Sequence, residues 1–120
     1  MSAGDTELRA PSVLEKNLVS RLLTNEFAGR NELRAQVEDL RVREIDNNGS
    51  LELVPGGAAP LAVVQQRIPV EARLIDSDGM TISILLHVLD GLMNELEIYR
   101  DDSEPVQREL SPEEVKPFTP

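Results

Sequence analysis

The stretch ISILLHVLDGLMNELEIYRDD, residues 82–102, decides the fold, because apolar and polar side chains alternate along it on both sides of one Asp-Gly pair. A period of two is typical of a β-strand with one buried face, and Asp-Gly is a turn dipeptide. The apolar positions of the first strand share one face: Met80, Ile82, Ile84, Leu86 and Val88. The other face carries His87, and on the second strand the residues turned away from Leu96 and Ile98 are Glu95, Glu97 and Tyr99. We therefore predict an antiparallel hairpin with an apolar core face and an open face on which the only histidine lies among carboxylates.

Shorter strands are predicted upstream of this hairpin. Residues 41–54 contain two candidate strands around Asn48-Gly49, a dipeptide that tolerates the positive φ angles of a tight turn. Residues 68–75 alternate again and end in the turn sequence DSDG. Pro69 has no N–H to donate to a ladder, so we expect that end of the strand to be an edge or a bulge.

Two helices are predicted before the sheet. Ser12 and Glu15 have the spacing of a capping box, and the residues that repeat every four positions after them are Leu14, Leu18 and Leu22. A shorter helix is expected at residues 31–40. Because the apolar face of a sheet must be covered, the sequence predicts an α+β fold: two N-terminal helices packed on one face of an antiparallel, meander-type sheet of four to five strands.

The length of 120 residues fits one domain. We expect a flexible lead at residues 1–11, a single α+β domain at residues 12–105, and a disordered or loosely docked, acidic, proline-containing tail at residues 106–120. The N-terminus lacks a basic start followed by an apolar core, and no apolar run approaches the length of a membrane span. A soluble, cytoplasmic protein without a membrane partner is therefore expected.

Negative charge is concentrated in the last third of the chain. Residues 76–120 contain eleven acids and three bases, whereas residues 1–30 contain four of each. This distribution opposes nucleic-acid binding, which needs clustered lysine and arginine. A partner that meets the C-terminal third is expected to be basic, although net charge of this kind also serves solubility alone.

Several kinds of site are disfavoured by the motifs. The chain has no cysteine and one histidine, so we expect no zinc site and no other metal. The DSDG turn fails as a calcium loop, because Leu74 and Leu85 would occupy ligand positions. The loop PGGAAP, residues 55–60, lacks the following helix or lysine of a phosphate cradle, and no cofactor is expected. General acid–base chemistry by His87 with Glu95 or Glu97 is conceivable, but no nucleophile motif accompanies it.

The remaining candidate site is the acidic face of the hairpin. It combines one aromatic residue and one imidazole with carboxylates, and its members are His87, Glu95, Glu97, Tyr99 and Asp101. Carboxylates attract lysine and arginine, and tyrosine is common at the centre of protein interfaces. The alternative is a solvated sheet face whose charges discourage edge pairing.

The segments IPVEARLIDSDG and ILLHVLDGLMNELEIYRDDSEP, within residues 68–105, resemble a family of small uncharacterised bacterial proteins. The shared pattern is a His-bearing apolar strand, an Asp-Gly turn and a strand close to Glu-Leu-Glu-Ile-Tyr-Arg. The sequence departs from the pattern at Ser103, where the family has glycine. The resemblance implies a bacterial origin and an α+β fold, and it supplies no catalytic residues.

From these observations we expect a non-catalytic interaction module that binds a basic protein partner, as an inhibitor or immunity-like protein would. One alternative is a small-molecule-binding or hydrolytic domain that uses His87 and nearby carboxylates. Another is a homo-oligomeric structural protein that hides the acidic face.

Overall fold

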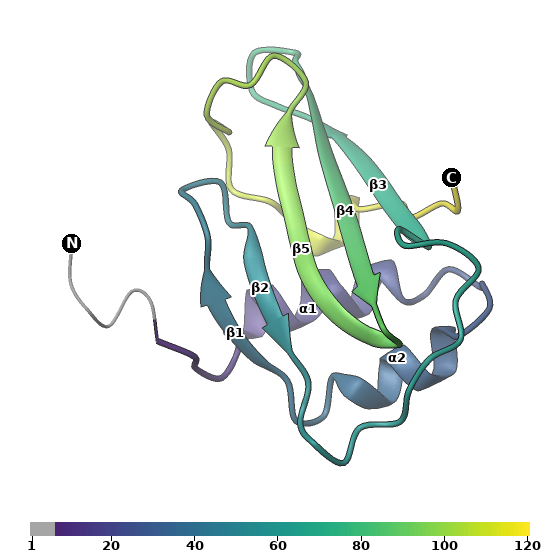
Figure 1. The fold of residues 1–120 in the computed structure, drawn as a ribbon. Helices are drawn as coiled ribbons and strands as arrows, with labels where there is room; N and C mark the ends of the chain where they lie inside the picture. Colours follow the sequence, from purple (N-terminus) through teal and green to yellow (C-terminus); the bar gives the residue numbers. More distant parts are fainter. Residues whose placement is uncertain (1–6) are drawn as a thin grey trace.

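The computed structural model describes residues 7–120, and its centre is a five-stranded antiparallel sheet (Figure 1). The strands are β1 (Arg41–Glu44), β2 (Leu51–Val54), β3 (Val70–Ile75), β4 (Thr81–Leu89) and β5 (Leu92–Arg100), in the spatial order β1-β2-β5-β4-β3. The predicted α+β class and antiparallel sheet are confirmed. Only β3, β4 and β5 follow one another as a meander, because β2 lies beside β5.

Two α-helices within residues 7–120 precede the sheet in the chain and are seen behind it in Figure 1. Helix α1 (Val13–Leu22) begins with the predicted capping box, in which the Ser12 side chain accepts from the Glu15 N–H and the Glu15 carboxylate accepts from the Ser12 N–H. Helix α2 (Arg30–Gln36) ends earlier than the sequence predicts. None of the helices among the described residues has the length and hydropathy that a membrane crossing requires.

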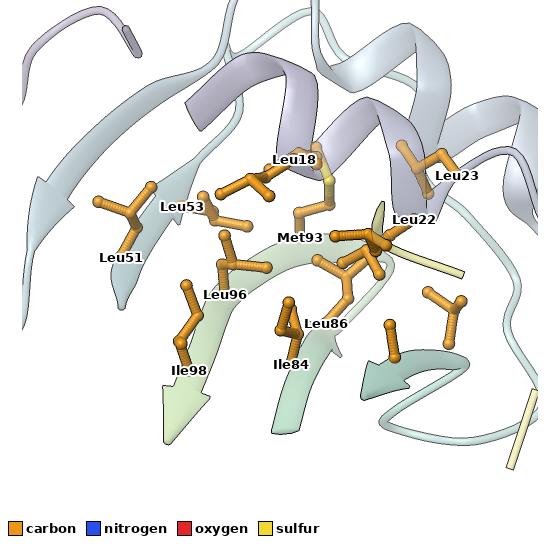
Figure 2. Packing of buried hydrophobic residues seen from close by; sticks show 14 of the residues in the cluster. Leu18, Leu22, Leu23, Leu51, Leu53, Ile84, Leu86, Met93, Leu96 and Ile98 are labelled. Atoms are coloured by element: carbon orange, nitrogen blue, oxygen red, sulfur yellow. The ribbon is translucent and has the colours of Figure 1, made fainter. Parts of the chain in front are cut away.

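The hydrophobic core lies between the helices and the inward face of the sheet. Figure 2 shows Leu18 and Leu22 of α1 facing Met93 of β5, with Leu86 and Leu96 close by. Each of these five side chains is buried. Their burial removes apolar surface from water, which is the main stabilising contribution to such a fold. The alternating face of residues 80–88 therefore packs as the period of two indicates, apart from the partly exposed Met80.

Both edges of the sheet are covered by single bridges from the ends of the chain. Arg9 pairs with Val42 of β1, and Phe118 pairs with Glu71 of β3. Such covers limit edge-to-edge pairing with another chain. Residues 1–6 of the lead predicted at residues 1–11 lie outside the described residues.

The C-terminal segment is packed against the domain. It contains the short 3₁₀ helix η2 (Pro112–Glu114), and Leu110 and Val115 belong to the hydrophobic core. The Arg21 guanidinium donates to the Val115 carbonyl at 2.8 Å. The domain predicted at residues 12–105 and this C-terminal segment thus share one hydrophobic core.

Candidate functional site

A β-bulge positions the acidic residues of the candidate site. From the Asp90–Gly91 turn, Val88 is opposite Met93 and His87 is opposite Glu95, so Asn94 is one extra residue on β5. An uninterrupted ladder would place Glu95 opposite Leu86, on the core face. The extra residue instead keeps Glu95 on the open face, while Met93 and Leu96 both stay buried.

His87, Glu95 and Glu97 form a compact cluster on this face. The His87 Nε2 atom lies 2.8 Å from Glu97 Oε1, and the ligand-type atoms of the three side chains all lie within 4.8 Å of one another. The His87 side chain is 14% exposed and that of Glu97 is 38% exposed. The imidazole is therefore shielded, and the carboxylate is open to solvent.

The neighbouring acids on the same face are neutralised by arginine, unlike those of the cluster. Glu52 of β2 is opposite Glu95 and pairs with Arg43 at 3.5 Å, and Glu71 of β3 pairs with Arg73 at 3.2 Å. Within residues 7–120, no lysine or arginine forms an ion pair with Glu95 or Glu97. The centre of the face thus holds two carboxylates whose only described basic neighbour is the His87 imidazole.

Tyr99 and Asp101 extend the face toward the other end of β5. Tyr99 is half-buried and opposite Ser83, and the Ser83 hydroxyl donates to Asp101 at 3.0 Å. The structure therefore brings His87, Glu95 and Glu97 together, whereas Tyr99 lies further along β5 and Asp101 directly follows its end.

Arg100 gathers a second acidic cluster on the core side of the same strand end. Its buried guanidinium contacts Asp76, Asp78 and Asp102 at 3.0, 2.9 and 2.6 Å. Hydrogen bonds from Arg100 lower the pKa of Asp102 to about 2, although burial opposes this shift. Burial raises the pKa of Asp76, but the Gln107 and Ser77 N–H groups and Arg100 together bring it below its usual range. These three carboxylates are therefore neutralised by Arg100, unlike those of Glu95 and Glu97.

Sequence reasoning missed two parts of this arrangement. Glu52 could not be placed beside Glu95, because the pairing of β2 with β5 joins strands far apart in the chain. Arg100 did carry a signal, since it continues the inward phase of Leu96 and Ile98 and has acids close by. An arginine at an inward strand position is expected only when carboxylates neutralise it.

A family model for a domain of unknown function, DUF6984, matches residues 8–110. The chain belongs to this family. The expected membership of an uncharacterised domain family is therefore confirmed, and the match includes α1, α2, all five strands and both acidic clusters of this DUF6984 domain. No curated protein and no solved structure matches the chain.

Proposed function

We propose that this DUF6984 domain is a non-catalytic interaction module that binds a basic segment of a partner protein on its open sheet face. The residues that would make contact are His87, Glu95, Glu97, Tyr99 and Asp101. Inhibitors and immunity-like proteins that neutralise basic enzymes use surfaces of this chemistry.

The observation that carries the proposal is the contrast between carboxylates that pair with arginine and carboxylates that do not. Glu52 and Glu71 on the flanking strands each have an arginine partner, while Glu95 and Glu97 at the centre have none among residues 7–120. A guanidinium or ammonium group from a partner would complete the pattern. Tyr99 on the same strand offers an aromatic contact beside the charges.

Affinity capture with matched variants tests this proposal. The wild-type domain, the double variant E95Q/E97Q and the control E104Q are immobilised, and lysate of the source cells is applied at low salt. Glu104 is an exposed acid near the same strand that lies outside the cluster. We expect a lysine- or arginine-rich protein to bind the wild type and E104Q, to be lost from the double variant, and to be released by salt.

The captured protein is then purified and titrated against each variant. Removing both central charges is expected to weaken binding at least about tenfold, because each close charge pair contributes to affinity and to the rate of association. Equal affinity for the wild type and E95Q/E97Q would exclude the open face as the docking surface.

A hydrolytic function is the second candidate, favoured by the short contact between His87 and Glu97, which resembles a base held by an orienting carboxylate. Among the hydroxyl residues on the same face of β4, Ser83 is the nearest to His87, but it lies four positions away, which is about 13 Å along a strand. Its hydroxyl is also buried and bonded to Asp101. If the domain hydrolyses an ester or amide substrate and His87→Ala abolishes this turnover, the hydrolytic hypothesis replaces the hypothesis of a docking surface.

A homo-oligomer is the third candidate, and two features argue against it. On each outer edge strand one residue is already bridged, Val42 of β1 by Arg9 and Glu71 of β3 by Phe118, which restricts edge pairing. Two copies meeting through the open face would also place Glu95 and Glu97 of one copy near those of the other, with repulsion between them.

A further inference from the structure

We propose that His87, Glu95 and Glu97 form a binding site for one divalent transition-metal ion of the Zn²⁺ class. The three side chains come from adjacent strands, and their ligand-type atoms lie within 4.8 Å of one another. This inference goes beyond the proposed function, because it depends on the imidazole, which a basic partner does not require.

The spacing of the cluster already approaches that of a coordination sphere. Zinc binds imidazole nitrogen and carboxylate oxygen at about 2.0–2.2 Å in tetrahedral geometry, so two ligand atoms on one ion lie about 3.3–3.6 Å apart. His87 Nε2 and Glu97 Oε1 are 2.8 Å apart. A metal ion would therefore replace the hydrogen that these two atoms share, with only a small movement of either side chain.

The backbone supports the same placement. His87 and Glu95 are opposite each other on the two longest strands, and Glu97 is two residues further along β5, on the same face. The extra residue Asn94 puts Glu95 on that face, and bulges that redirect a side chain are frequent beside functional sites. Ligands on paired strands are held more firmly than ligands on loops.

Charge and donor type select the class of ion. Two carboxylates without an arginine or lysine partner among residues 7–120 favour a cation between them. One nitrogen and two oxygen donors suit Zn²⁺, Co²⁺ or Ni²⁺, whereas Mg²⁺ and Ca²⁺ prefer oxygen alone, and Cu⁺ prefers sulfur. Three protein ligands leave a position for water.

The surroundings of His87 set the expected strength of binding. Its Nδ1 atom is buried and has no hydrogen-bond partner within residues 7–120. A metal-bound histidine normally donates its second N–H to a carboxylate or carbonyl group, and sites without this support bind metal more weakly. We therefore expect micromolar rather than nanomolar affinity, and weaker binding at acidic pH, because protons compete for the same ligand atoms.

Titration of the untagged, chelator-treated domain with ZnCl₂ tests the site, with MgCl₂ as a second titrant. The variants are H87Q, which keeps both carboxylates, E97Q, which keeps the imidazole, and the control E104Q. We expect one Zn²⁺ per chain for the wild type and E104Q, and affinity lowered at least about tenfold in H87Q and E97Q. Mg²⁺ should bind weakly and equally to all four proteins.

Co²⁺ provides a second readout, since its visible absorption changes when a histidine and carboxylates replace water around it. We expect a visible absorption band of protein-bound Co²⁺ in the wild type and no such band in H87Q, whose folding is checked by circular dichroism. Equal Zn²⁺ affinity for the wild type and a folded H87Q would overturn the site. That result would leave the docking proposal intact, because partner capture depends on Glu95 and Glu97 and is measured without added metal.

Discussion

At the scale of single residues, Arg100 and Asp102 make the stability of the domain depend on pH. Asp102 accepts two hydrogen bonds from the guanidinium, and its pKa falls from 3.8 to about 2. A carboxylate with a lowered pKa in the folded state stabilises the fold above its unfolded pKa, and this contribution is lost as the pH falls through the folded value. The relevant window therefore runs from about pH 4 down to about pH 2.

We predict that Asp102→Asn is less stable than the wild type at neutral pH and that the difference disappears as the pH is lowered through this window. Urea unfolding at a series of pH values measures the free energy of unfolding of both proteins. The control is E104Q, which should stay parallel to the wild type. A gap between the wild type and Asp102→Asn that is constant from neutral pH to pH 2 would show that the ion pair does not respond to protonation in this way.

Gln36 shows what a sequence does not reveal at this scale. Its side chain is 1% exposed. It donates to the carbonyls of Pro60 and Gly91 at 2.8 Å and accepts from the Met93 N–H at 2.9 Å, so all three groups are satisfied. A glutamine in a short helix predicts a solvated position, because burial of an amide depends on main-chain partners that only the tertiary fold supplies.

At the scale of elements, the bulge at Asn94 is expected to affect metal binding and the stability of the fold in different ways. Deleting Asn94 would leave Val88 opposite Met93 and His87 opposite Glu95, with no interruption of the ladder. The deletion would therefore preserve both faces of β5. It would also remove the local twist that a bulge adds beside these residues.

We predict that the Asn94 deletion variant folds with an unfolding free energy equal to or up to about 1 kcal/mol above that of the wild type, because a regular ladder replaces an unpaired residue. Zn²⁺ affinity is expected to fall, since the orientation of Glu95 relative to His87 changes. Unfolding in urea and Zn²⁺ titration measure the two effects. A destabilised variant would indicate that Asn94 itself stabilises the hairpin.

The elements that the sequence predicted well are those with a strong local pattern. The capping box at Ser12 and the alternation along residues 82–88 and 95–99 depend on neighbours in the chain, and both are found in the structure. The bulge at Asn94 was not predicted. Its signal in the sequence is the spacing of the apolar residues, which is three from Met93 to Leu96 but two from Leu96 to Ile98. Pro69, where an edge or a bulge is expected, lies directly before β3, which is an edge strand of the sheet.

At the scale of the whole molecule, the two chain ends contribute contacts that composition conceals. Val115 is fully buried within a segment rich in proline and acids, and Phe118 pairs with Glu71 through both of its main-chain polar groups. The guanidinium of Arg73 also lies 5.0 Å from the centre of the Phe118 ring. Single anchors of this kind have no period, so a sequence pattern does not predict them.

We predict that removing residues 111–120 has two separable effects. Loss of Val115 from the core is expected to lower the free energy of unfolding by roughly 2–3 kcal/mol. Loss of Phe118 uncovers the outer edge of β3, which is then free to pair with another chain. Urea unfolding measures the first effect, and sedimentation velocity over a range of protein concentrations measures the second.

The variant Val115→Ala distinguishes these effects, because it shortens one core side chain and keeps the bridge between Phe118 and Glu71. It should be destabilised by about 1–2 kcal/mol and stay monomeric, whereas the truncated chain should associate as its concentration rises. If the truncated chain stays monomeric at every concentration, the terminal segment stabilises the core but does not prevent pairing at the edge of β3. If both variants associate, the cause of self-association is the loss of stability and not the loss of Phe118 from the edge of β3. A destabilised fold exposes strand edges by itself.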